Sequence, residues 1–261
     1  MKQILMTGLF ISILAIAANS QSKHVTHVMN SVSELREISQ EVVKDYISLG
    51  AEVEHEMARH EIDEGIALFE DHLFELEDYD ETTQIVAQLE KLEEIWMPMR
   101  LILVREPDKT KAPALITHST ELMQEADKLL GLIEDQVKFH EAKLVNLASR
   151  EAVLSQRVAM LYIAKYWDIN YTNLEKDFKE AKNEFSNDLK ELLAATQNTP
   201  AIIKQLKRVE SEWEFAQETM HFDSKELNPS IIFVSTHQIM KRMDKVTHLY
   251  HELHLEKHEK S

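Results

Sequence analysis

The chain has no cysteine, and its 261 residues include only 4 glycines and 5 prolines. Without cysteine it forms neither a disulfide nor a thiolate metal site, so packing alone must stabilise it. A fold built from many short strands needs more turn residues than this chain supplies. Leu, Glu, Lys and Ala are abundant instead, and this composition predicts an all-α fold.

Positive charge is also scarce. The 29 Lys and Arg residues face 46 Asp and Glu residues, so the formal net charge is −17. An excess of this size repels a phosphate backbone along most of the surface, which excludes a general nucleic-acid-binding protein. The acidic surface is instead expected to keep the protein dispersed in water.

A long apolar run occurs only at the N-terminus, where Ile4 to Ala18 follows Lys2. This run is too short to cross a bilayer, and small residues that a signal peptidase can cleave follow it. Residues 1–20 are therefore predicted to be a signal peptide, and the mature protein to be periplasmic or secreted and not embedded in a membrane. An uncleaved anchor is disfavoured because the residues after the run are small and polar.

Sequence signals for catalysis are missing. The chain has no cysteine nucleophile, no Gly-x-Ser-x-Gly elbow and no glycine-rich phosphate loop. We therefore predict no catalytic residue, no cofactor and no enzymatic activity. Trp96, Trp167 and Trp213 are expected to fill the core rather than to bind a cofactor.

Apolar residues recur at helical spacing through almost the whole chain, as in the series Val42, Tyr46, Leu49 and Val53. Breaks are expected where Pro, Asn, Asp and Ser concentrate, at residues 78–80, 106–113, 168–171, 198–200 and 222–229. Between Pro113 and Trp167 only Gly131 interrupts the pattern. This predicts a continuous helix of roughly 50 residues, about 75 to 80 Å long.

The two halves of the chain resemble each other at an offset of 116 to 117 residues. The matches are residue-specific, because they include Ser39-Gln40 on Ser155-Gln156, Tyr46-Ile47 on Tyr162-Ile163, Phe69 on Phe185, and Trp96 on Trp213. An internal repeat of this kind indicates two copies of one helical unit. We predict two tandem antiparallel bundles of about four helices each, residues 24–139 and residues 140–261, which share the long central helix.

Basic residues form a line on the helix that opens the second copy. Lys143, Arg150 and Arg157 lie seven residues apart, roughly 40° from the apolar stripe, and so at the edge of a buried seam. A guanidinium group at such an edge suits a planar anion or a carboxylate. Either an external ligand or acidic residues of a neighbouring helix could supply that group.

This helix, Asn146-Leu-Ala-Ser-Arg-Glu-Ala-Val-Leu-Ser-Gln-Arg157, resembles the signature helix of the PilJ-type N-terminal domain of type IV pili methyl-accepting chemotaxis transducers. That domain is related to the sensor domain of nitrate/nitrite histidine kinases. Trp96-Met-Pro-Met-Arg100 is similar to a later stretch of the same family. The resemblance implies a sensory helical bundle that binds a small ligand, often at a dimer interface. Its expected ligand-binding residues are Ser149, Arg150, Ser155, Gln156 and Arg157.

The departures from the family pattern restrict this expectation. The family's anion-binding arginine corresponds to Ala152, so nitrate is not the expected ligand. In the first copy, Glu34 and Glu41 replace Arg150 and Arg157, while Arg36 aligns with Ala152. The second copy is therefore the expected site for a small anion. A sensor kinase or chemoreceptor would receive the signal as a partner protein, and a homodimer is compatible with this role.

Two alternatives stay open on the sequence alone. A metal-binding bundle would use Glu52-x-x-His55 and Glu218-x-x-His221, which have the spacing of di-iron carboxylate proteins, or the terminal histidines His248, His251, His254 and His258. Such spacings arise readily in a chain with 46 acids and 13 histidines, so we predict no metal site. The second alternative is a helical scaffold that binds no ligand.

Overall fold

The computed structural model describes residues 27–77, 83–136, 142–222, 224 and 226–259, so the predicted signal peptide lies outside the described residues. The described part contains helices and turns and no strand, which confirms the all-α prediction. A first helix covers residues 27–50. The helices that follow are α2 (His55–Glu77), α3 (Thr83–Leu103), α4 (Ala112–Gln136), α5 (Ala142–Tyr166), α6 (Leu174–Ala194), α7 (Pro200–Thr219) and α8 (Pro229–Glu259).

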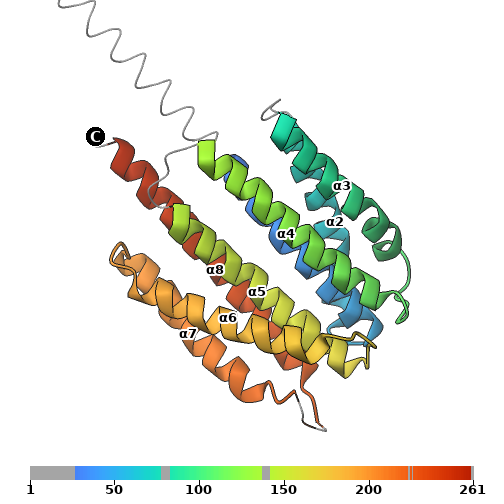
Figure 1. Cartoon of the computed structure of the whole chain (residues 1–261). Helices are drawn as coiled ribbons and strands as arrows, with labels where there is room; N and C mark the ends of the chain where they lie inside the picture. The colour runs from blue at the N-terminus through green and yellow to red at the C-terminus, as the bar shows by residue number, and fades with distance from the viewer. Residues whose placement is uncertain (1–26, 78–82, 137–141, 223, 225, 260–261) are drawn as a thin grey trace, which may run out of the picture.

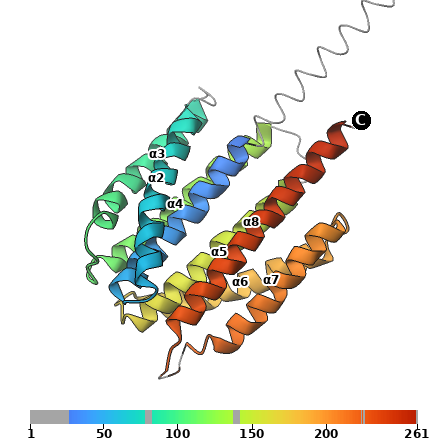
Figure 2. The ribbon, with the colours of Figure 1, turned by 180° about the vertical axis from the view of Figure 1, so that it is seen from behind.

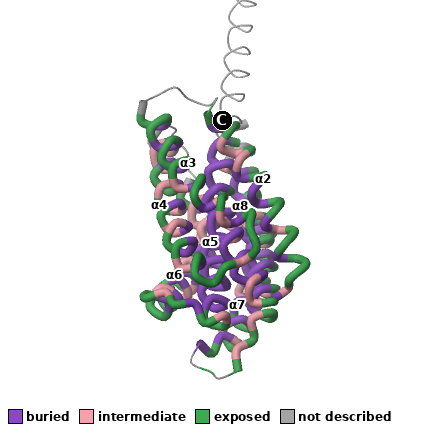
Figure 3. The backbone as a smooth tube through the Cα atoms, turned by 90° about the vertical axis from the view of Figure 1, so that its right-hand side faces the viewer, coloured by how far each residue is buried: buried purple, intermediate pink, exposed green. Residues whose placement is uncertain are grey.

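Four helices occupy the middle of the molecule: the first helix, α4, α5 and α8 (Figure 1, Figure 2). The α2–α3 hairpin lies on one side of them, and the α6–α7 hairpin lies on the other. Because α5 is packed against other helices on all sides, none of its faces meets solvent in this stretch, and every residue from 151 to 164 is buried. Figure 3 shows this concentration of buried residues along the inner helices.

The predicted continuous helix between Pro113 and Trp167 is wrong. The chain forms two helices there, and α4 and α5 run in opposite directions (Figure 1). The Arg157 guanidinium donates to Thr120 Oγ1 at 2.9 Å, so the late part of α5 lies beside the early part of α4. Reversal lets the apolar stripes of both helices enter the same core, a tertiary gain that no proline or glycine at residues 137–141 announces.

The other predicted breaks are largely correct. Turns separate the helices at residues 104–111, 167–173, 195–199 and 220–228, whereas residues 78–82 lie outside the described residues. One break was missed, at residues 51–54. It is made by a hydrogen-bonded helix end in which the Val53 amide donates to the Ser48 carbonyl at 2.8 Å and Glu52 takes the left-handed conformation (φ 58°).

Equivalent residues in the two halves of the chain make equivalent contacts. The second copy ends its first helix in the same way, with the Ile169 amide bonded to the Ala164 carbonyl at 2.9 Å and a positive φ of 56° at Asp168. Phe69 stacks on Trp96 with ring centroids 3.9 Å apart, and Phe185 lies 4.0 Å from Trp213. All described helices contribute to one continuous apolar core.

The halves also touch directly where the first helix ends. A Cβ atom added to Gly50 would lie 2.3 to 2.9 Å from the Trp167 ring, far inside van der Waals contact. Gly50 is therefore required by close packing, because the indole of the second half lies against its backbone. Gly131 differs, since an added Cβ would meet no atom within 4 Å.

We predict that Gly50→Ala lowers the free energy of unfolding by about 1–3 kcal/mol, because the indole must leave its position. The matched substitution Gly131→Ala should leave stability unchanged or raise it by up to about 1 kcal/mol through helix propensity. Urea denaturation of both variants measures the difference. Equal effects of the two substitutions would contradict the packing described here.

Candidate functional site

The polar centre of the molecule is the seam where the first helix and α5 face each other. Gln40 and Gln156 occupy equivalent positions, and each donates to a carbonyl oxygen of its own half, at Ser119 (2.7 Å) and Thr236 (3.2 Å) respectively. Each then accepts from a cation of the other half. Lys44 Nζ lies 2.8 Å from Gln156 Oε1, and the Arg157 guanidinium lies 3.2 Å from Gln40 Oε1. These crossed, buried hydrogen bonds join the two halves.

Arg157 is held at one edge of this seam and is only 8% exposed. It donates to Gln40 and Thr120, and a second nitrogen lies 3.6 Å from the Asp177 carboxylate on α6. Burial lowers its pKa and the Asp177 charge raises it, but a guanidinium stays charged at neutral pH in either case. At this edge of the seam, α6 and the start of α4 therefore cover Arg157.

Arg150 and Lys143 lie further out on the same line. Arg150 is about two-fifths exposed and contacts Glu184 and Asp188, the latter at 3.5 Å. Lys143 is exposed and bonds to Glu191 at 2.5 Å. Internal carboxylates of α6 thus pair with the whole line, which is the second of the two interpretations that the sequence allowed.

Arg36 crosses the seam from the first half, which sequence reasoning did not predict. Its guanidinium donates to Ser149 Oγ at 2.5 Å, to Asn146 Oδ1 at 3.0 Å and to Asp127 Oδ1 at 2.5 Å. The side chain is buried, and its Nε has no hydrogen-bond partner among the described residues. The alignment of Arg36 with Ala152 was the available signal, because the arginine missing from one copy is present in the other.

Arg36, Arg150 and Arg157 line one cavity of about 310 Å³ between α4, α5 and α6, here called the arginine pocket. Both halves therefore supply its cations. Its wall also carries carboxylates, at Asp127, Asp177, Glu180 and Glu184. Because the lining contains both cations and carboxylates, it suits a ligand with an anionic group. The same ligand can also carry a hydrogen-bond donor for the carboxylates.

The five predicted ligand-binding residues fall into two groups. Arg150 and Arg157 line the arginine pocket, and Ser149 holds Arg36 there. Ser155 and Gln156 are instead fully buried in the seam, where Ser155 Oγ lies 3.3 Å from the Thr236 carbonyl of α8, to which Gln156 also donates. Their role in this structure is to join helices.

The first helix, α2 and α8 form a second edge of the seam, and this edge is acidic. Lys44 Nζ lies 3.1 Å from Asp45, 3.5 Å from Glu61 and 3.8 Å from Glu41. Burial raises the pKa of Asp45 well above its usual range, against the opposing effect of Lys44. Carboxylates outnumber cations within this cluster.

The carboxyl groups of Glu37 and Asp244 also lie at the acidic edge, and they are hydrogen-bonded to each other. Burial and the Asp244 charge raise the pKa of Glu37 well above its usual range. Burial also raises the pKa of Asp244 to about 6, with repulsion from Glu41 and Glu34 added. Burial and the close approach of the two carboxyl groups thus both disfavour the doubly ionised pair.

The metal motifs of the alternative interpretation form no group of three or more ligands among the described residues. Among the described residues, the His, Asp and Glu side chains close enough to share an ion are Glu41, Glu61 and His237. Glu52 lies in the left-handed turn after the first helix, and Glu218 is exposed at the end of α7. His248 is exposed whereas His251 is buried, and the side chains of His254 and His258 lie outside the described residues.

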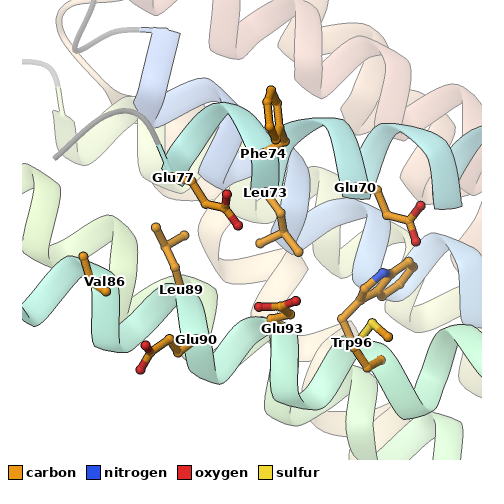
Figure 4. Close-up of a pocket in the computed structure, with 10 residues that line it drawn as sticks. Glu70, Leu73, Phe74, Glu77, Val86, Leu89, Glu90, Glu93 and Trp96 are labelled. Carbon is orange, nitrogen blue, oxygen red and sulfur yellow. The ribbon is translucent and has the colours of Figure 1, made fainter. Parts of the chain in front are cut away.

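A larger cavity, of about 500 Å³, lies between α2 and α3 (Figure 4). Leu73, Leu89 and Trp96 give this α2–α3 groove an apolar floor, and Phe74 beside it is 70% exposed. The polar residues that line the groove are glutamates, namely Glu70, Glu77, Glu90 and Glu93. The groove thus combines an apolar surface with negative charge.

No family model matches the chain, and no curated protein or solved structure shows detectable similarity to it. Among the described helices, none has the length and apolar content needed to span a bilayer.

Proposed function

We propose that this protein is an exported sensory binding module, and that it recognises a small ligand with an anionic group in the arginine pocket. The observation that carries the proposal is the convergence of Arg36, Arg150 and Arg157 on one cavity. The cavity brings three guanidinium groups together beside four carboxylates, in a chain whose net charge is −17. Planar donors of this kind suit carboxylate and oxyanion ligands.

The pocket offers both fixed and exchangeable cations. Arg36 and Arg157 are held by neutral partners as well as acids, so their orientation does not depend on a ligand. Arg150 is more exposed and is paired only with acids of α6. An anion that replaces those acids at Arg150 gives up an ion pair worth about 1 kcal/mol or less. Zwitterions gain further, since Glu180 and Glu184 accept hydrogen bonds from an ammonium group.

The resemblance to PilJ-type domains supports the same function. Such domains bind small ligands, often at a dimer interface, and here Arg36 of one copy lines a pocket with Arg150 and Arg157 of the other. One chain thereby provides two copies in contact. In this proposal residues 1–20 direct export, and a partner sensor kinase or chemoreceptor receives the signal.

We predict that Arg150→Gln weakens ligand binding by roughly tenfold or more, because one charge-assisted pair is lost. Thermal-shift screening of nitrate, sulfate, acetate, glycine and glutamate identifies a stabilising compound, and calorimetry then measures its Kd. Arg150→Ala, which leaves the crossed hydrogen bonds of the seam in place, should weaken binding at least as much while helical circular dichroism is retained. Arg208→Gln, an exposed arginine on α7, is the matched control and should bind normally.

Failure of every compound with an anionic group to raise the melting temperature of the wild type would argue against this function. Equal loss of binding in Arg208→Gln and Arg150→Gln would also do so, because Arg208 is not part of the pocket.

A second function is favoured by the α2–α3 groove, which we propose binds a basic amphipathic helix of a partner protein. The charge of the groove selects this occupant: its lining residues include four glutamates, and Arg100, which lies on α3, is paired with Glu70. An apolar helix face fits Leu73, Leu89 and Phe74, while lysines and arginines at its borders reach the carboxylates. The indole Nε1 of Trp96, buried beneath, has no hydrogen-bond partner among the described residues.

The other half of the molecule lacks these features. At the positions equivalent to Phe74 and Glu90, the α6–α7 hairpin carries Lys190 and Lys207. The same fold therefore presents a basic residue where the groove presents an aromatic ring or an acid. Only the first half is expected to attract a basic helix.

We predict that a synthetic Leu/Lys amphipathic helix of about 18 residues binds the wild type, with an affinity that falls as salt is added. Phe74→Lys should weaken binding at least roughly tenfold, because it removes an apolar contact and adds a repelling charge. Phe215→Lys alters another exposed aromatic residue, 54% exposed and on α7, and serves as the control. Fluorescence anisotropy measures both. Unchanged binding in Phe74→Lys, or self-association of the protein through this face, would contradict the proposal.

A further inference from the structure

Three metal-ligating side chains meet at the acidic edge, each from a different helix. Glu41 comes from the first helix, Glu61 from α2 and His237 from α8. His237 Nδ1 lies 3.4 Å from Glu61 Oε1 and 3.9 Å from Glu41 Oε1. The three ligand atoms all lie within 4.8 Å of one another.

The distances between these ligand atoms are close to the distances between the ligand atoms around a bound metal ion. Ligand atoms about 2.0–2.1 Å from a tetrahedral zinc ion lie about 3.3–3.4 Å from one another. The distance between His237 and Glu61 already has this value, and the distance to Glu41 exceeds it by about 0.5 Å. Since all three pairs of ligand atoms lie within 4.8 Å, a shift of at most about 1.5 Å in any one separation completes three ligand positions.

His237 is a second and independent observation. Its side chain is more than nine-tenths buried, and its Nδ1 has no hydrogen-bond partner among the described residues. That nitrogen faces the two glutamates, and a buried polar atom without a partner costs free energy. Burial lowers the pKa of His237 to about 4, so the imidazole is neutral at pH 7, as metal ligation requires.

The second copy has a positive charge at a position where the acidic edge has a negative one. The positions equivalent to Glu41, Glu61 and His237 hold Arg157, Asp177 and Thr120, where the arginine occupies the space between its two partners. In the first copy, Glu61 is the acid on the hairpin, as Asp177 is in the second copy. Glu41 stands at the position where the second copy has Arg157. Two carboxylates thus face a position that holds a cation in the other copy.

Lys44 balances only part of this charge. It shares one ammonium group among Glu41, Asp45 and Glu61, and its closest contact is Gln156 at 2.8 Å. The two carboxyl groups of Glu41 and Glu61 thus face a single ammonium group that is shared with other partners, and a divalent cation would offset the remaining negative charge. Lys44 keeps Gln156 and Asp45 as partners when Glu41 and Glu61 bind an ion.

We propose that Glu41, Glu61 and His237 form a binding site for a first-row divalent transition-metal ion such as Zn²⁺. One imidazole nitrogen and two carboxylate oxygens suit zinc and its neighbours, whereas calcium and magnesium prefer oxygen ligands alone. The ion can enter from solvent, because the side chains of Glu41 and Glu61 are 14% and 15% exposed. The equivalent positions of the second copy cannot bind a metal, so we expect one ion per chain.

The test is calorimetric titration of ZnCl₂ into the full-length mature chain, purified without a histidine tag and stripped with a chelator. We expect one high-affinity ion per chain, and a Co²⁺ complex with the strong visible absorption of a tetrahedral site. His237→Gln and Glu61→Gln should each weaken binding by at least roughly tenfold. His60→Gln is the matched control, because its imidazole adjoins Glu61 in sequence but is 76% exposed.

The terminal histidines provide a competing source of zinc binding, which a His254→Gln, His258→Gln double variant removes. The proposal requires that this variant keep the high-affinity ion. Loss of the ion there, or equal weakening in His60→Gln and His237→Gln, would overturn the assignment, as would a wild type that binds no zinc. Circular dichroism checks folding, and Glu61→Gln preserves side-chain shape if His237→Gln does not fold. Anion binding at the arginine pocket is measured separately and does not decide this result.

Discussion

The crossed hydrogen bonds between Lys44 and Gln156 and between Arg157 and Gln40 are the constraint on which the rest of the structure depends. Both cations are buried, and a buried charge is tolerated only when its partners are in place. A hydrogen bond to a charged group contributes about 1.5–3 kcal/mol. Both bonds form only when the first helix and α5 keep this register, so they favour it over other registers.

The same register places two chemically opposite sites at the edges of one seam. On the side of α4 and α6, Arg157 contacts Thr120 and Asp177. At the equivalent positions on the side of α2 and α8, Glu41 faces His237 and Glu61. A repeated framework has thus kept its backbone contacts while the charge at one edge has reversed. This divergence is the physical basis for assigning an anion to one edge and a metal cation to the other.

Much of the fold follows from local and periodic signals in the sequence. Scarce glycine and proline, helical spacing and the paired positions of Tyr46 with Tyr162 and Trp96 with Trp213 predicted an all-α repeat. The reversal between α4 and α5 could not be predicted in this way, because it depends on burial of two stripes against each other and not on a local break. The helix end at residues 51–54 was missed because Glu52 takes a backbone conformation usually given to glycine.

The candidate sites show the same division between local and long-range information. Spacing alone placed Arg150 and Arg157 at an edge, and both line the arginine pocket. Arg36 reaches Asn146 and Ser149 from 110 and 113 residues away along the chain, and His237 meets Glu61 from an even more remote position. No periodicity within one helix encodes such contacts, since they arise only when the halves close on each other.

A double-mutant cycle across the seam tests this account most directly, with Lys44→Met, Gln156→Leu and the double variant. Methionine is the residue that the second copy has at the position equivalent to Lys44, namely Met160. The account predicts that each single substitution is strongly destabilising, and that the urea-derived free energies of unfolding show a coupling of about 1–3 kcal/mol. Additivity to within about 0.5 kcal/mol would show that the two side chains do not depend on each other, and would contradict it.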